Sequence, residues 1–164
     1  WRNYAGALPG LVGQAPAAVV AAGSAAEFIA QVRQGVESYH YHQALQATLQ
    51  HLLTPTNQYL EAQAPWKLVK TDPAAAAQVL ARAVESLRVA AIVLKPFLPR
   101  TAAAIYESFN FQLPWDQVRY ADAAEPEVLR EDRRAAAPLV DGKPKPLFPR
   151  IELDSPPQSP KTSR

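Results

Sequence analysis

The chain has 164 residues, of which 48% are hydrophobic and 20% charged, with a formal net charge of +2. This length and composition predict one soluble globular domain with tails. The sequence contains no cysteine, which excludes disulfides, zinc fingers and thiol nucleophiles. A sequence pI near 9.0 is compatible with nucleic-acid binding, but so small a net charge does not identify it.

No apolar run approaches the roughly 20 residues that span a bilayer, and the N-terminus lacks the charged and apolar regions of a secretory signal. We therefore expect a cytoplasmic protein with no membrane partner. The chain begins with Trp1 and contains no methionine, so we also expect a piece of a longer protein.

Glycine and proline mark the expected limits of the domain. Residues 1–23 hold four of the six glycines and predict a connector with the remnant of a truncated helix. Residues 24–111 predict a helical bundle, so the fold class is all-α. Residues 112–153 predict an irregular and extended segment that packs back on the bundle, and the Pro/Ser-rich residues 154–164 predict a disordered tail.

The first helix of the bundle is predicted to begin at Ser24, because Ser24 and Glu27 have the spacing of a capping box. Apolar residues then recur at steps of three and four and predict one buried stripe. The stripe comprises Phe28, Ile29, Val32, Val36 and Tyr39. Gly35 is expected to weaken the last turns of this helix.

A second, longer helix is predicted from another stripe at helical spacing. This stripe comprises Leu45, Leu49, Leu52, Thr56, Tyr59 and Gln63. Pro55 lies inside it and predicts a kink or a brief break near Thr54, at a cost of roughly 3 kcal/mol unless the kink is accommodated. Pro65 is predicted to end the helix, with residues 66–70 as the link onward.

A third helix is predicted from Asp72 as N-cap and Pro73 as first helical residue, ending at Pro96. Its expected buried stripe is Ala77, Leu80, Val84, Leu87, Ala91 and Leu94. Three charged residues are expected to lie mostly on the outside, namely Arg82, Glu85 and Arg88. A sharp corner at Pro99 then leads into a short helix that presents Ile105, Tyr106 and Phe109.

The chain loses its apolar periodicity after Asn110. Trp115 is expected in a core or between domains, because it follows Phe109 and Phe111. Residues 120–134 predict a short surface helix or a loop. Residues 138–151 alternate proline with apolar residues, which predicts extended backbone with three anchors, Leu147, Phe148 and Ile151.

The sequence offers no catalytic or metal site. His40 and His42 are two apart, so on a helix they do not face each other and do not make a metal pair. Four carboxylates are interleaved with arginines, which is typical of a solvated face. They are Glu125, Glu127, Glu131 and Asp132. Phosphate loops, nucleophile elbows and zinc-protease motifs are absent from the sequence.

Trp66 allows two interpretations. As a structural residue it would cap the bundle, since most tryptophans are largely buried. As a functional residue it would be a stacking platform for a nucleic-acid base, beside Lys67 and Lys70, with Asn57 and Gln63 able to read base edges. The pattern by itself leaves both open.

Three sequence blocks resemble the anticodon-binding domain of bacterial-type methionyl-tRNA synthetases, which are class I aminoacyl-tRNA synthetases. They are the segment from Asn57 through Ala64-Pro65-Trp66 to Lys70, the segment from Leu87-Arg88 through Lys95-Pro96-Phe97-Leu98-Pro99 to Ala102, and Lys145-Pro146-Leu147-Phe148-Pro149-Arg150-Ile151. The resemblance covers about residues 1 to 153. The first two blocks recur in sister class I synthetases, whereas the last favours the methionine enzyme.

This resemblance implies a helical bundle that receives the anticodon loop of tRNA. It implies that Trp66 stacks on the first base of the CAU anticodon, with Pro65 fixing its approach. Asn57, Glu61 and Gln63 occupy matching positions beside it. The family also uses an asparagine and an arginine on a preceding helix, and we expect these upstream of Trp1.

The resemblance further implies a parent enzyme that attaches methionine to tRNA using ATP. ATP and methionine would bind to a catalytic domain that this chain lacks, so we expect no cofactor here and no aminoacylation by this chain alone. The segment 112–153 could then pack on that catalytic domain instead of the bundle. Two alternatives remain: the anticodon-binding domain of a sister class I synthetase, and a helical protein-interaction module that does not bind RNA.

Overall fold

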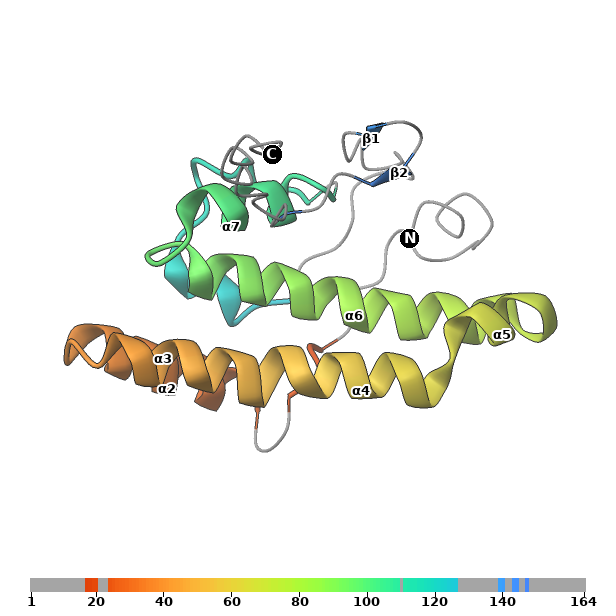
Figure 1. The fold of residues 1–164 in the computed structure, drawn as a ribbon, viewed down its shortest axis with the longest axis horizontal. Coiled ribbons are helices and arrows are strands. Elements are labelled where there is room, and N and C mark those ends of the chain that lie inside the picture. Colours follow the sequence, from red (N-terminus) through yellow and green to blue (C-terminus); the bar gives the residue numbers. More distant parts are fainter. Residues whose placement is uncertain are drawn as a thin grey trace, which may run out of the picture.

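The computed structural model describes residues 17–20, 24–109, 111–126, 139–140, 143–144 and 147. Its described part is a helical bundle in which a long rod, made of α3, η1 and α4, lies beside α6 (Figure 1). A short helix, α5, joins the two at one end, while α2 and α7 lie toward the other end. The predicted all-α bundle is confirmed. The helices are α2 (Ala25–Glu37), α3 (Tyr41–Thr48), the π-helical η1 (Leu49–Leu53), α4 (Thr54–Gln63), α5 (Pro65–Thr71), α6 (Pro73–Leu94), α7 (Pro99–Tyr106) and the 3₁₀-helical η2 (Tyr120–Ala123).

The N-terminus of α2 is capped as predicted. The Ser24 Oγ accepts a hydrogen bond from the Glu27 amide at 3.2 Å, and the Glu27 Oε2 accepts one from the Ser24 amide at 2.7 Å. The stripe is buried at Phe28, Ile29 and Val32. The prediction for Tyr39 was wrong, because Tyr39 lies beyond the helix with a φ of 62° and is 79% exposed.

Gly35 has a packing role that the sequence did not indicate. A Cβ atom at this position would lie 3.0 Å from the Cβ of Ala44 on α3. The two helices therefore approach so closely that a larger residue would displace one of them. Glycine weakens this turn of α2 but allows α2 and α3 to pack together.

Pro55 is accommodated by a π-helical turn directly before it. The amide of Thr54 donates to the carbonyl of Leu49, five residues back, instead of four. The Thr56 hydroxyl donates to the Leu52 carbonyl at 2.7 Å. The wider turn relieves the clash between the proline ring and the preceding turn, so the break predicted near Thr54 is confirmed and takes this form.

The π turn also explains why one predicted core residue is exposed. Leu49 is 56% exposed, whereas the buried face of the rod is formed by other residues. They are Ala44, Ala47, Thr48, Leu52 and Thr56. The predicted stripe assumed one uniform α-helix, but a π turn contains extra chain and rotates the following residues relative to the preceding ones.

The central helix, α6, begins and ends as predicted. The Asp72 Oδ1 accepts a hydrogen bond from the Ala75 amide at 2.9 Å, Pro73 is the first helical residue, and the last is Leu94. The prediction that Glu85 and Arg88 face outward was wrong, because they are 3% and 1% exposed. Other parts of the chain cover α6 on several sides and enclose Glu85 and Arg88, whereas Arg82 is exposed as predicted.

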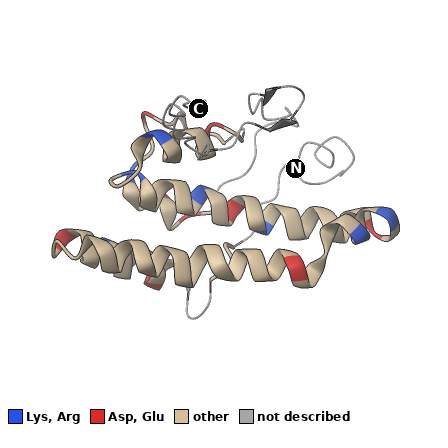
Figure 2. Cartoon of the chain, viewed as in Figure 1, with Lys and Arg blue, Asp and Glu red and all other residues tan. Residues whose placement is uncertain are grey.

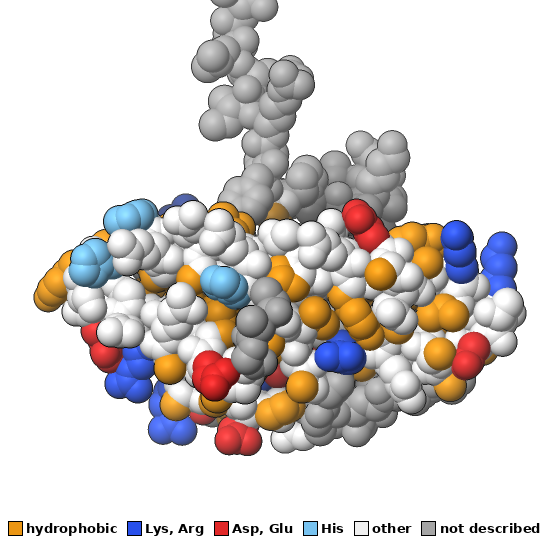
Figure 3. Space-filling model, turned by 90° about the horizontal axis from the view of Figure 1, so that it is seen from below, with side chains coloured by type: hydrophobic (Ala, Val, Ile, Leu, Met, Phe, Trp, Pro, Cys, Tyr) orange, Lys and Arg blue, Asp and Glu red, His pale blue; other side chains and the backbone are white. Residues whose placement is uncertain are grey.

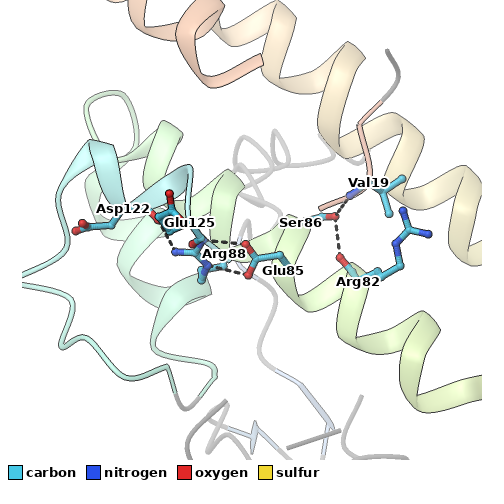
Figure 4. Close-up of polar contacts among 7 residues, drawn as sticks. All are labelled: Val19, Arg82, Glu85, Ser86, Arg88, Asp122 and Glu125. Carbon is cyan, nitrogen blue, oxygen red and sulfur yellow. Dashed lines mark hydrogen bonds and ion pairs between the residues drawn. The ribbon is translucent and has the colours of Figure 1, made fainter. Parts of the chain in front are cut away.

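Arg88 is buried with hydrogen-bond acceptors around its guanidinium (Figure 4). Its Nε and Nη2 each donate to the Glu85 carboxylate at 2.8 Å. Its Nη1 donates to the Asp122 carbonyl at 2.9 Å and its Nη2 to the Glu125 carbonyl at 2.5 Å. One guanidinium thus attaches residues 111–126 to the middle of α6. On the same helix the Ser86 hydroxyl accepts from the Val19 amide at 2.9 Å, which attaches residues 17–20.

The corner between α6 and α7 and the segment after it confirm two more predictions. Tyr106 is buried, as expected for the short helix. The Trp115 ring lies 5.1 Å from the Tyr106 ring and packs against the core. The Lys95 Nζ lies 4.4 Å from the Trp115 ring and donates to the carbonyls of Trp115 and Val118 at 3.1 and 2.8 Å.

Beyond this segment the described residues are few. In the predicted helix or loop 120–134 the chain forms the single 3₁₀ turn η2, and residues 127–134 lie outside the described part. Two strands, β1 (Leu139–Val140) and β2 (Lys143–Pro144), pair antiparallel, which confirms extended backbone there. Leu147 is 49% exposed. Phe148, Ile151 and the predicted tail lie outside the described residues.

Candidate functional site

The corner between α4 and α5 is built around an unusual residue, Ala64. Its φ of 43° and ψ of 59° place it in the left-handed region, which non-glycine residues rarely occupy. The following Pro65 disfavours the α conformation for Ala64, so α4 ends at Gln63. The Ala64 carbonyl then accepts from the Lys67 amide at 2.8 Å and opens α5. The link predicted at residues 66–70 is therefore a short helix.

This corner turns the Trp66 indole outward. Pro65 is buried, and the half-buried Leu68 and Val69 pack on a small apolar cluster of α6. With these three residues facing inward, Trp66 lies on the outer side of α5 and is 47% exposed. An indole that caps a core would be mostly enclosed, whereas this one presents about half of its surface to solvent.

Positive charge accompanies the exposed indole. Lys67 and Lys70 are both exposed on α5, and among the described residues neither takes part in an ion pair. Basic residues colour the α5 end of the bundle blue in the cartoon (Figure 2), and basic side chains project at the same end in the space-filling view (Figure 3). The combination of an open aromatic surface and unpaired cations suits a flat, anionic ligand.

The three other predicted residues lie on α4 but do not share one face. Asn57, Glu61 and Gln63 are all exposed. The Asn57 Nδ2 donates to the Glu61 Oε1 at 3.2 Å, so these two form a pair along one row. Glu61 and Gln63 are two residues apart and point about 160° away from each other on an α-helix. Gln63 shares its row with Tyr59 instead.

One contact between α4 and α6 was not foreseen as part of a site. The guanidinium Cζ of Arg82 on α6 lies 5.1 Å from the centre of the Tyr59 ring on α4. Arg82 was expected only to face outward, and it is indeed exposed. No signal in the sequence joins two residues so far apart on separate helices.

The described residues show no alternative site based on metal chemistry. Within them, no group of three or more His, Asp or Glu residues could hold a metal ion. His40 and His42 are exposed, and so is Glu125, while Glu127, Glu131 and Asp132 lie outside the described part. In the same part of the chain, no helix combines the length and apolar character that a membrane crossing requires.

The fold and this corner together define a helical binding domain. Residues 11–140 match the family described as the anticodon binding domain of methionyl tRNA ligase. This match covers most of the chain, so the chain belongs to that family. The resemblance to this family is thereby confirmed; the match includes the first two sequence blocks, whereas the third, at residues 145–151, lies beyond it.

Curated relatives agree with the family match. A methionine–tRNA ligase from Brucella suis biovar 1 is 32% identical over 151 residues, which are 89% of this chain and 26% of the relative. One from Thermosynechococcus vestitus is 29% identical over 167 residues, covering 95% of this chain and 30% of the relative. One from Methanocorpusculum labreanum is 29% identical over 124 residues, which cover 76% of this chain and 17% of the relative. The chain therefore spans less than a third of the length of these relatives.

Proposed function

We propose that this chain binds the CAU anticodon loop of methionine-specific tRNA, with Trp66 as the stacking platform for the first anticodon base. The observation that supports this most is the half-exposed indole on the outer side of α5, next to the buried Pro65. A partly exposed aromatic ring can stack on the face of an unpaired base. Single-stranded loops are where proteins read RNA sequence.

The polar residues of α4 would read the base edges next to the stacked base. The Glu61 carboxylate is an acceptor that suits the exocyclic amino group of cytosine. Asn57 holds Glu61 in place through their hydrogen bond and offers its own amide to a base. Gln63 lies on the other side of α4 and would contact a different nucleotide. Lys67 and Lys70 would attract the phosphate backbone.

The parent enzyme would be a methionine–tRNA ligase, which attaches methionine to tRNA using ATP. This proposal rests on the names of the relatives, in which the matched region is less than a third of the length. ATP and methionine would bind to the catalytic domain, the second partner of this chain, and anticodon recognition would be the contribution of this chain.

A panel of anticodon stem-loops tests this proposal. Each stem-loop carries one anticodon on the same stem, and its affinity for the chain is measured by fluorescence anisotropy at low salt. We expect the tightest binding to CAU, with a changed base losing its edge contacts and weakening binding by roughly 1–3 kcal/mol, or about fivefold to 150-fold. Preference for another anticodon would instead assign the chain to a sister synthetase. Absence of binding to every stem-loop would favour a protein-interaction module.

A further inference from the structure

Arg82 is held over an aromatic ring instead of a carboxylate. Its guanidinium Cζ lies 5.1 Å from the centre of the Tyr59 ring, within the distance at which a cation and an aromatic face attract each other. Figure 4 shows its side chain extending away from the α6 backbone. Its backbone carbonyl accepts a hydrogen bond from the Ser86 hydroxyl at 2.9 Å, which leaves the side chain for other contacts.

Three other arginines of the described part of the chain form ion pairs with acids. Arg33 pairs with Glu37 at 2.7 Å, Arg88 with Glu85 at 2.8 Å, and Arg119 with Asp122 at 3.7 Å. Among the described residues the guanidinium of Arg82 makes no such pair. When the flat face of a guanidinium lies on an aromatic ring, its N–H groups stay available to donate hydrogen bonds, because they project from the edge of the guanidinium plane.

The pair lies close to the corner that carries Trp66. Tyr59 and Gln63 are one turn apart, about 6 Å along α4. Trp66 follows three residues later, at most about 11 Å of chain further. The Arg82 guanidinium and the indole are thus separated by a distance that a few nucleotides of an RNA strand can span. Trp66 lies at the end of the bundle where α4 turns back through α5 into α6 (Figure 1), and Arg82 lies further along, near the middle of α6.

We infer that Arg82, positioned by the Tyr59 ring, binds a phosphate of the RNA strand whose base stacks on Trp66. This inference rests on the proposed function and adds a second contact to it. Arginine donates two parallel hydrogen bonds to a phosphate and is always charged. Contact with the ring restricts the side chain before RNA arrives, so less conformational entropy is lost on binding. The contact is to the backbone, so it strengthens binding without reading sequence.

Salt dependence separates this role from base stacking. Affinity for the CAU stem-loop is measured at several salt concentrations for the wild type and for Arg82→Gln. We expect Arg82→Gln to bind several-fold more weakly at low salt, and the slope of log affinity against log salt to fall by about 0.7. The fold-loss should be the same on a stem-loop with a changed anticodon. An unchanged affinity and slope would overturn the inference.

Three further variants show whether Tyr59 positions Arg82. Tyr59→Phe retains the ring and should bind like the wild type. Tyr59→Leu removes the ring and should lose part of the affinity that Arg82→Gln loses. The double variant Tyr59→Leu with Arg82→Gln should bind as weakly as Arg82→Gln alone. Net charge is controlled by a separate variant, Arg100→Gln, because Arg100 is an exposed arginine on α7. This variant should leave the slope of log affinity against log salt unchanged. Equal slopes for Arg82→Gln and Arg100→Gln would contradict a specific phosphate contact.

The outcomes distinguish the inference from the proposed function. If the wild type prefers CAU and Arg82→Gln matches it at all salt concentrations, the inference fails and the anticodon assignment stands. If the wild type binds all stem-loops equally while Arg82→Gln lowers the slope, the phosphate contact stands and the anticodon assignment fails. If no stem-loop binds at low salt, both fail.

Discussion

Replacement of Arg88 by methionine should strongly destabilise the bundle. Arg88 is 1% exposed, and its guanidinium donates to the Glu85 carboxylate and to the carbonyls of Asp122 and Glu125. Arg88→Met removes these donors from two backbone carbonyls and from the Glu85 carboxylate, which is 3% exposed. Breaking a buried pair from one side costs about 3–5 kcal/mol, a large share of the roughly 5–15 kcal/mol that stabilises a domain.

This loss is large enough to measure by thermal unfolding. For a chain of this size, about 2–4 °C of melting temperature corresponds to 1 kcal/mol, so we expect a fall of about 6–20 °C by circular dichroism. Arg33→Met is the matched control, because it breaks an ion pair with Glu37 whose side chains are 65% and 62% exposed. It should leave the melting temperature nearly unchanged, because solvent screens an exposed ion pair. The double variant Glu85→Leu with Arg88→Met should recover part of the loss. Equal effects of Arg88→Met and Arg33→Met would refute the structural role of the buried pair.

Three smaller changes test other parts of the fold. Burial raises the pKa of Tyr120 to about 12, Arg33 lowers it and Glu37 raises it, and the hydroxyl donates to the Ile29 carbonyl at 2.9 Å. The folded pKa of Tyr120 lies above the unfolded value near 10, so the protonated hydroxyl stabilises the fold. Its contribution to the free energy of unfolding is complete below pH 10 and is lost as the pH rises toward 12. Tyr120→Phe should reduce that alkaline loss, and an ultraviolet titration in which Tyr120 ionises near pH 10 would contradict it. Gly35→Ala gains up to about 1 kcal/mol of helix propensity, but its methyl group overpacks against Ala44 at a cost of about 1–3 kcal/mol. We therefore expect a net loss of stability in urea unfolding. Adding Ala44→Gly should recover part of that loss. Ala64→Gly relieves about 1–2 kcal/mol of strain in the left-handed backbone conformation and loses about 0.4–1 kcal/mol because the unfolded chain becomes more flexible. The variant should therefore be slightly more stable in urea unfolding. A clear loss of stability would show that Ala64 is not strained.

The limits of most helices could be predicted because their signals are local. Ser24 and Asp72 act as caps within one turn of their own residues, and Pro65 and Pro96 end helices through their own rings. The surroundings of α6 could not be predicted in this way. Arg88 is buried because carbonyls of Asp122 and Glu125, more than 30 residues away in the chain, converge on it.

Two features of the core went beyond helical periodicity and propensity. The stripe through Leu49 assumed a constant helical period, and the π turn before Pro55 changed that period. Gly35 was interpreted through its propensity alone, although it allows the close approach of Ala44. This second feature depends on how two helices pack, which the pattern of one helix does not contain.

The residues of the candidate site were found through the sequence blocks, but their arrangement was not. The block around Ala64-Pro65-Trp66 indicated the indole, and only the packing of Leu68 and Val69 shows that it faces outward. The contact of Arg82 with Tyr59 joins residues on two helices and has no sequence pattern of its own. Helix spacing does account for the Asn57–Glu61 pair, which lies four residues apart.

The central claim is that the exposed indole of Trp66 stacks on an anticodon base. The most direct test compares the affinities of the wild type, Trp66→Ala and Tyr39→Ala for the CAU stem-loop at one salt concentration. Tyr39 is a matched control because its ring is 79% exposed in the loop between α2 and α3, at the other end of the bundle. We predict that Trp66→Ala weakens binding by about fivefold to 150-fold with unchanged helix content, while Tyr39→Ala binds like the wild type. Equal affinity of Trp66→Ala and the wild type would contradict the account.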